Sequence, residues 1–165
     1  MHYRALPPIE ELYDLFVPDF EAGTLVWKYA HGRRKIGDTA GFQNDRYMIV
    51  GIKGARYYVH RVLYAMYHQA DPGELEIDHS DGDRLNNSIA NLREATRAQN
   101  GQNIRGYRKG LKGAYKSFKG DKPWMSTIQK DGTRHYLGAY ATEEEAHEAY
   151  VKASAVHHGT FGRAA

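Results

Sequence analysis

The chain has 165 residues, a length that fits one ordinary domain or two small modules. Hydrophobic residues make up 41% and charged residues 26%, a balance that argues against intrinsic disorder. The absence of cysteine excludes disulfides, thiolate catalysis and cysteine-ligated zinc. No apolar run approaches the roughly 18 residues of a membrane span, and the N-terminus lacks the apolar core of a secretory signal, so we expect a cytoplasmic protein.

The formal net charge of +3 is unevenly distributed along the chain. Residues 71–83 contain six acidic side chains and no Lys or Arg, whereas residues 105–134 contain nine basic side chains against two acidic ones. Clustered carboxylates attract cations, and a basic segment attracts polyanions. The charge pattern therefore indicates a centre that favours metal beside a region that favours nucleic acid, although many charged runs are only solvated surface.

The N-terminal part is predicted to be a small segment of helix and short strands. Apolar spacing predicts a short helix at residues 9–16. Short apolar runs interrupted by glycine predict strands at 25–27, 47–50 and 57–59. Residues 60–67 have no helix breaker and carry one apolar face, which predicts a second helix.

Residues 74–106 read as two strands followed by a helix. A strand is predicted near residues 75–79, then a polar loop, and a return strand at 92–95. Thr96 and Gln99 match a capping box, which places Asn100 about one turn inside the helix. The middle of the chain is therefore predicted to be a ββα unit.

This unit contains residue types suited to phosphodiester hydrolysis. Asp78 offers a metal ligand and the adjacent His79 a general base. Asn100 offers a second oxygen ligand, and an all-oxygen set suits Mg²⁺ or Mn²⁺. An EF-hand loop starting at Asp78 is excluded because its sixth position is Asp83 and not glycine. A loop whose polar side chains only cap backbone groups stays an alternative.

The middle of the chain contains a series of short polar pairs: Asp78-His79, Gly82-Asp83, Asn86-Asn87, Asn91-Leu92 and Gln99-Asn100. Together they resemble the motif of the HNH, or ββα-metal (His-Me finger), nucleases found among phage-encoded and homing endonucleases. The upstream segments Gly23–Lys28 and His60-Arg61-Val62 resemble segments of the same phage proteins.

The resemblance implies a role for each matched position. His79 would be the general base, Asp78 and Asn100 would hold one divalent cation per site, Mg²⁺ or Mn²⁺, and Asn91 would tether the loop and so orient the imidazole. Asp78 and His79 can share one site only if the strand ends or twists there, because neighbouring strand residues point to opposite faces. Other residues have weaker expectations: Arg84 and Arg93 as phosphate contacts or solvated surface, Asn86 and Asn87 as loop caps, and His60 as a packed structural residue.

The last third of the chain is predicted to be a three-stranded antiparallel sheet packed on one helix. Strands are expected at 113–118, 124–128 and 136–140, and Asp131-Gly132 is a strong hairpin signal between the last two. Thr142 and Glu145 form a second capping box that opens a helix with a small-residue face.

This region resembles the DNA-binding domain of plant ethylene-response and Apetala-type factors. The resemblance rests on Lys112–Tyr115, Trp124, Leu137–Tyr140, Thr142–Ala146, Ala149-Tyr150 and Gly159–Phe161. It implies that the sheet lies in the major groove of DNA, with lysines on phosphates and Gln129 or Arg134 reading base edges. Trp124 is expected either on that surface or in the core behind it. The candidate exposed DNA-binding residues are Lys116, Lys119, Lys122, Trp124, Ser126, Gln129, Lys130 and Arg134.

The sequence therefore predicts an α+β protein with an HNH nuclease domain at 1–106 (core about 74–106), a linker at 107–112 and a DNA-binding domain at 113–165. The expected function is metal-dependent cleavage of double-stranded DNA, by nicking or double-strand cutting, in the host cytoplasm if the protein is phage-encoded. Monomer and homodimer stay open. The alternatives are a non-cleaving, sequence-tolerant DNA-binding or regulatory protein that retains the scaffold, and an RNA-directed nuclease or binder.

Overall fold

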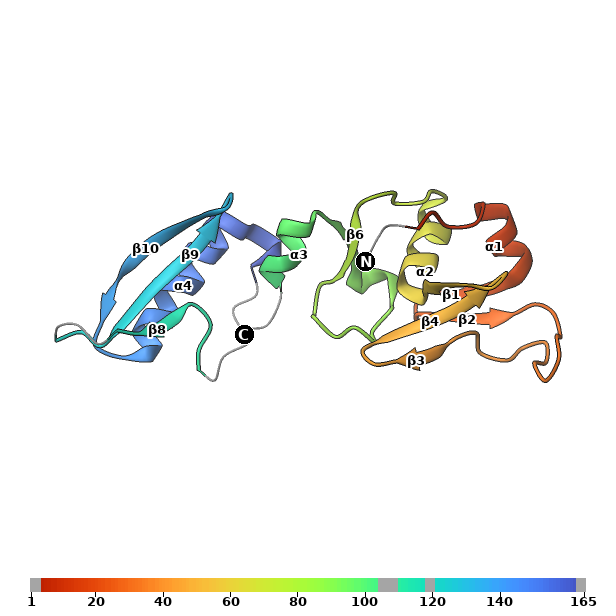
Figure 1. The fold of residues 1–165 in the computed structure, drawn as a ribbon, viewed down its shortest axis with the longest axis horizontal. Helices are drawn as coiled ribbons and strands as arrows, with labels where there is room; N and C mark the ends of the chain where they lie inside the picture. The colour runs from red at the N-terminus through yellow and green to blue at the C-terminus, as the bar shows by residue number, and fades with distance from the viewer. Residues whose placement is uncertain (1–3, 104–109, 118–120, 163–165) are drawn as a thin grey trace. The chain divides into compact units, whose positions relative to one another are not determined.

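The computed structural model describes residues 4–103, 110–117 and 121–162, and the chain divides into two compact units between Arg97 and Ala98. Within these ranges it forms four helices and several small antiparallel sheets, which confirms a mixed α and β protein (Figure 1). No helix in the described ranges is long and apolar enough to cross a membrane. The division falls before the linker predicted at 107–112, of which residues 107–109 lie outside the described residues.

The N-terminal unit contains two helices, a three-stranded sheet and two hairpins. The strands β1 and β2 pair with each other, the sheet has the order β3-β4-β5, and β6 pairs with β7. All of these pairings are antiparallel. The elements are α1 (Ile9–Leu15), β1 (Phe16–Asp19), β2 (Thr24–Trp27), β3 (Phe42–Asn44), β4 (Tyr47–Ile52), β5 (Ala55–Tyr58), α2 (Val59–His68), β6 (Glu76–His79), the 3₁₀ turn η1 (Ile89–Asn91) and β7 (Leu92–Ala95).

The main hydrophobic core lies between the two helices and the first five strands. Burial of a large apolar side chain stabilises the fold by about 1.5–3 kcal/mol, so this cluster is the chief source of stability in the unit. Its fully buried members come from every one of these elements except α1's first turn, β3 and β5. They are Leu12, Phe16, Leu25, Val50, Val59, Val62, Leu63, Ala65 and Met66.

The helix α2 joins this core to the β6–β7 hairpin. Val62, Leu63 and Met66 face the main core, whereas Tyr64 packs in a second cluster with Ile77 of β6 and Leu92 of β7. One helix thus contacts two apolar clusters. The hairpin is positioned by α2 and does not rely on its own four-residue strands for stability.

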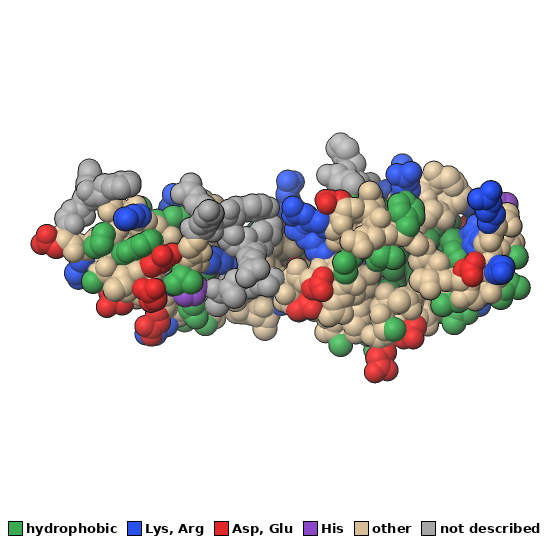
Figure 2. Space-filling view, turned by 90° about the horizontal axis from the view of Figure 1, so that it is seen from below, with side chains coloured by type: hydrophobic (Ala, Val, Ile, Leu, Met, Phe, Trp, Pro, Cys, Tyr) green, Lys and Arg blue, Asp and Glu red, His purple; other side chains and the backbone are tan. Residues whose placement is uncertain are grey.

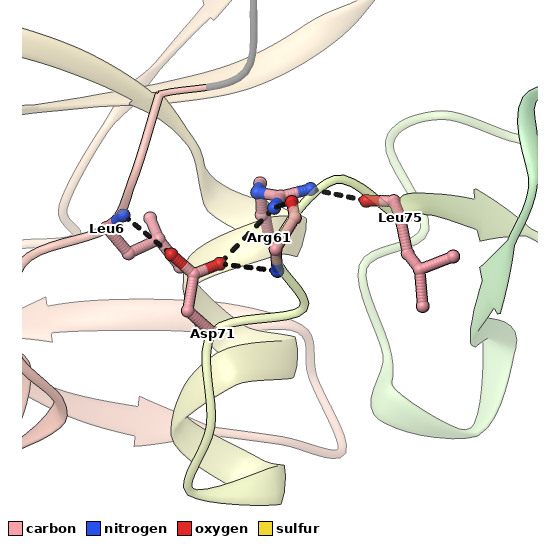
Figure 3. A network of polar contacts seen from close by, with 5 residues as sticks. Leu6, Arg61, Asp71 and Leu75 are labelled. Carbon is pink, nitrogen blue, oxygen red and sulfur yellow. Dashed lines mark hydrogen bonds and ion pairs between the residues drawn. The ribbon is translucent and has the colours of Figure 1, made fainter.

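Arg61 of α2 fixes the segment that leads into β6. Its guanidinium donates to the Asp71 carboxylate at 3.2 Å, to the Leu75 carbonyl at 2.7 Å and to the Gly73 carbonyl (Figure 3). The other oxygen of the Asp71 carboxylate accepts from the backbone N–H of Leu6 at 2.9 Å. The Arg61 side chain therefore holds the chain on both sides of the turn before the hairpin.

The long loop between β6 and β7 rests against the β1–β2 turn. The N–H of Ile89 donates to the Phe20 carbonyl at 2.9 Å. Gly23 adopts φ +69°, and a Cβ on it would lie 2.4 Å from the carbonyl carbon of Asn87. Glycine is required here for both reasons, because a side chain would push the loop away from the turn.

The C-terminal unit contains a three-stranded sheet with the order β10-β9-β8 and a helix packed on one face. At Asp131-Gly132 both φ values are positive, 49° and 76°, as a two-residue hairpin turn requires. The predicted capping box at Thr142 and Glu145 is present at the start of the long helix. The elements are α3 (Arg97–Asn103), β8 (Ala114–Lys116), β9 (Trp124–Lys130), β10 (Thr133–Tyr140), α4 (Glu143–His158) and the 3₁₀ turn η2 (Gly159–Phe161).

Part of the DNA-binding surface predicted for this sheet is wrong, because some of the predicted residues lie on the face that the helix covers. Ser126, expected to be exposed, is fully buried and donates from Oγ to the Gly113 carbonyl at 3.1 Å. Trp124 and Ile128 alternate with it and therefore share the helix-covered face, which favours the packing role for Trp124. Gln129 pairs with Arg134, and both side chains point to the opposite face.

The lysines predicted to bind DNA differ in position. Lys116 and Lys130 are exposed, but their strand positions belong to the helix side of the sheet. Lys122 is exposed before β9, and Lys119 lies outside the described residues. Among the described residues visible in Figure 2, each unit carries both acidic and basic side chains.

Candidate active site

The β6–β7 hairpin buries Asp78 and His79 side by side at the end of β6, each only 4% exposed. The strand ends at His79, which still pairs with Leu92 in the strand register. Neighbouring strand residues point to opposite faces, and the two side chains accordingly have different partners. A buried carboxylate and a buried imidazole each need such a partner, because polar groups removed from water are costly when left unpaired.

Asp78 forms an ion pair across the hairpin with Arg93. The two residues are directly opposite in the strand register, and Nε and a terminal nitrogen of Arg93 donate to the same carboxylate oxygen at 2.9 and 2.8 Å. Removing one partner of a buried pair typically costs about 3–5 kcal/mol. Arg93, predicted to contact phosphate or to lie in solvent, is therefore mainly the countercharge of Asp78 in this structure.

Asn87 holds the imidazole of His79. Nε2 of His79 lies 3.0 Å from Oδ1 of Asn87, and the Asn87 side chain is only 2% exposed. An amide oxygen can only accept, so this contact places the proton of the neutral ring on Nε2. Nδ1 is then the nitrogen able to take up a proton. Asn87, expected to be a loop cap, is thus a direct partner of the candidate base.

His60 packs its ring edge against His79. Their ring centroids are 4.8 Å apart at an interplanar angle of 70°, and Tyr58 stacks on His60 from another side at 5.3 Å. Burial lowers the pKa of His60 to about 3, with further contributions from His79 and Arg61. No hydrogen-bond partner reaches Nδ1 of His60 among the residues that the structure describes. His60 is therefore a neutral, packed ring, in line with the structural role expected for it.

The loop after His79 is organised by Asp81 and Asn91. The Asn91 amide donates to Asp81 at 2.9 Å and to the Asn86 carbonyl at 2.8 Å, while its oxygen accepts from the Asp81 N–H. Partial burial alone would raise the pKa of Asp81, but hydrogen bonds from Asn86, Asn91 and the Asp83 N–H lower it overall. These contacts tie the loop to the start of β7, which is the geometry a tethering role for Asn91 needs.

The metal ligands predicted from sequence are distributed over both units. Asp78 belongs to the β6–β7 hairpin of the first unit, whereas Asn100 lies half-buried in α3, in the part of the chain that belongs to the second unit. Among the described residues no group of three or more His, Cys, Asp or Glu is arranged to hold an ion. The chemistry of a carboxylate plus an amide oxygen fits a hard divalent cation that keeps water and phosphate as its other ligands. The pairing of Asp78 with Asn100 stays a prediction.

Sequence reasoning missed two features of this site. Arg84 was expected either as a phosphate contact or as solvated surface, and its packing on a ring was not foreseen: its guanidinium carbon lies 5.2 Å from the centre of the Tyr47 ring. Tyr47 itself was read only as a strand residue, yet its ring lies 6.4 Å from His79. No local motif marks Tyr47, because it reaches His79 from a different sheet.

The lowered pKa of His60 predicts acid-sensitive stability. Between about pH 6.5 and 3 the unfolded chain gains a proton at this residue that the folded chain does not, so the free energy of unfolding falls as the pH drops. Chemical denaturation at several pH values should show a loss near 1.4 kcal/mol per pH unit from this group. His60→Phe should flatten that dependence, whereas His31→Phe, at an exposed histidine, should not. Equal slopes in all three proteins would contradict a neutral, buried His60.

Comparison with known proteins points to the same part of the chain. Residues 57–102 match the family model of the HNH endonucleases, a range that starts in β5 and continues through α2 and the hairpin into α3. A protein of Acanthamoeba polyphaga mimivirus described as an uncharacterized HNH endonuclease is 31% identical over 99 residues, which cover 56% of this chain and 48% of that protein. The chain thus spans about half the length of this relative. No solved structure matches this chain significantly.

The family match does not extend into the C-terminal sheet, so its resemblance to Apetala and ethylene-response domains stays a prediction. It does include His60, Arg61, Asp78, His79 and Arg93. Residues 57–102 of this chain are therefore the part that is similar to the HNH endonucleases.

Proposed function

We propose that the protein is a metal-dependent endonuclease that hydrolyses phosphodiester bonds of double-stranded DNA, related to the phage and homing nucleases that its motif resembles. The observation that carries this proposal is the buried His79, whose Nε2 is held by Asn87 in the segment that matches the HNH endonucleases. A buried imidazole fixed in one tautomer by such a partner is suited to general-base catalysis. One such site per chain means that a monomer nicks one strand at a time.

In the proposed reaction, Nδ1 of His79 takes a proton from water as the water oxygen bonds to phosphorus, and the bond from phosphorus to the 3′ oxygen breaks, with the 3′ oxygen taking a proton from solvent. Asn87 keeps the ring in the reactive tautomer and orientation, and Asn91 keeps the loop that carries Asn87 in place. Asp78 and Asn100 would hold a divalent cation, Mg²⁺ or Mn²⁺, which supplies Lewis-acid stabilisation of the charge that develops on the phosphate. His79 must be neutral to act, so acid should suppress cleavage.

The Asp78–Arg93 ion pair favours a second candidate function. A carboxylate already paired with a guanidinium is a weaker metal ligand than one exposed to solvent, because the cation must share it or displace Arg93. A non-cleaving DNA-binding protein that retains the nuclease scaffold is consistent with this pairing. Cleavage and metal dependence, measured together, separate the two functions.

We expect wild-type protein to convert supercoiled plasmid to open circle with Mg²⁺ or Mn²⁺ and not with EDTA. His79→Ala should lose this activity while DNA affinity changes little, because the base contributes to the reaction and not to binding. A nicking assay and a gel shift on the same DNA test both statements. Equal loss of cleavage and binding would show that His79 is structural, and no cleavage with any divalent metal would favour the non-cleaving alternative.

Asn87→Ala should lower the cleavage rate by about 10- to 100-fold at unchanged DNA affinity, because the imidazole loses the partner that sets its tautomer. Asn86→Ala is the matched control, since its side chain bonds to Asp81 and not to His79. Single-turnover rates at saturating DNA make the comparison. If both variants cleave equally well, Asn87 does not orient the base.

We further propose that the outward face of the C-terminal sheet contacts DNA. Gln129 and Arg134 are adjacent cross-strand neighbours on this face, and both are exposed. Their side chains suit contacts with base edges or phosphates.

Arg134→Ala should therefore cost about 1–3 kcal/mol of DNA-binding free energy. Lys130→Ala, a change of equal charge on the helix side of the sheet, should cost less. Titrations at several salt concentrations measure both variants. Equal losses would show that the outward face is not the contact surface.

A further inference from the structure

The sheet β3-β4-β5 has one face in the main core, and its other face carries side chains that the proposed mechanism does not use. On β4, Met48, Val50 and Ile52 pack in the core, so the alternate residues Tyr47 and Ile49 point the other way. The register aligns Phe42 of β3 and Tyr58 of β5 with Ile49. Arg56 is paired with Gly51 and points to this same face.

Tyr47 connects this face to the candidate base. Its ring centroid lies 5.0 Å from Tyr58, 5.6 Å from His60 and 6.4 Å from His79. His60 in turn contacts His79 at 4.8 Å. Of these three rings Tyr47 is half-buried while His60 and His79 are buried, so Tyr47 is the ring through which a surface ligand would approach the imidazole of His79.

Two arginines on this face are held by aromatic rings. The guanidinium carbon of Arg84 lies 5.2 Å from the Tyr47 ring centre, and that of Arg56 lies 5.9 Å from Phe42. A guanidinium packed on a ring is restrained yet keeps its N–H edge for a second partner. Planar N–H edges of this kind bind phosphate oxygens in pairs.

We propose that this surface, the Tyr47 face, formed by Phe42, Tyr47, Arg56, Tyr58 and Arg84, binds the DNA strand that His79 cleaves. Arg56 and Arg84 contact phosphates of that strand, and the Tyr47 ring packs against the sugar next to the scissile phosphate. The inference rests on the proposed nuclease function, and it adds the part of the protein that binds the substrate at the site of cleavage. A nucleic-acid strand is the ligand of choice because its phosphates suit the two guanidiniums and its sugars and bases suit aromatic rings.

The test compares Arg56→Ala and Arg84→Ala in the full chain with Arg33→Ala, a control that removes an exposed arginine from the loop between β2 and β3. Affinity for a labelled DNA duplex is measured by fluorescence anisotropy in EDTA at several salt concentrations, so that cleavage does not interfere. Each Tyr47-face variant should bind about 3- to 10-fold more weakly and lose about 0.9 from the slope of log affinity against log salt, as expected for one phosphate contact. Arg33→Ala should bind within about twofold of wild type, as a surface change without a contact does.

The outcomes separate this inference from the proposed function. Wild-type cleavage together with unchanged binding by both Tyr47-face variants would overturn the Tyr47 face and leave the nuclease assignment intact. Weaker binding by these variants without any wild-type cleavage would support the surface and overturn the nuclease. Equal weakening by Arg33→Ala would show general electrostatic attraction and would also overturn the Tyr47 face. The same titration is repeated with an RNA strand. Tighter binding of RNA than of DNA would overturn DNA as the ligand.

A second measurement does not depend on removing charge. The chain has no cysteine, so a single Phe42→Cys substitution can carry a photocrosslinker at one defined position. Phe42 is 50% exposed, and Ile36→Cys, at a residue 70% exposed outside the Tyr47 face, is the control. Crosslinking of DNA from position 42 and not from position 36 supports the proposal. Equal or absent crosslinking from position 42 overturns it.

Discussion

The burial of two adjacent polar residues, Asp78 and His79, at the end of β6 is the constraint on which the N-terminal unit depends. Each requires a partner, because an unpaired buried charge or polar group costs several kcal/mol. Arg93 pairs with Asp78 only in the observed strand register, and Asn87 reaches His79 only if the loop returns toward β6. Gly23 allows that return by letting the loop backbone lie against the β1–β2 turn. The strand register, the path of the loop and the geometry of the β1–β2 turn are therefore all needed to give Asp78 and His79 their partners.

The second histidine supports this arrangement without taking a charge. Burial keeps His60 neutral through the physiological range, so it places no positive charge beside the imidazole of His79. Its neighbour Arg61 holds the chain before β6. These two consecutive residues of α2 thus act on the same hairpin in different ways. His60 packs its ring against His79, and the Arg61 guanidinium donates hydrogen bonds to backbone carbonyls before β6.

Residues whose roles depend on local pattern could be predicted from the sequence, and residues whose roles depend on register could not. The capping box at Thr142 and the hairpin at Asp131-Gly132 are local, and both are present. The strand β3 was missed because Phe42–Asn44 is short, exposed and without alternation. Asn86 and Asn87 are indistinguishable in sequence, yet one bonds to Asp81 and the other to His79. The Asp78–Arg93 pair joins residues 15 apart through a strand register that sequence does not fix.

The family match covers the β6–β7 hairpin but not most of the apolar core that supports it. It begins at residue 57, whereas the apolar face of α2 packs on Leu12, Phe16, Leu25 and Val50, all of which lie before that point. A short helix is stabilised mainly by packing of its apolar face. Without these residues α2 would lose that packing, and the β6–β7 hairpin that rests on α2 would lose its position. The segment before residue 57 therefore belongs to the same compact unit as most of the residues that match the family. Tyr47 and Phe42 come from that same segment, so the part of the chain that stabilises the motif is also the part that we propose contacts the substrate.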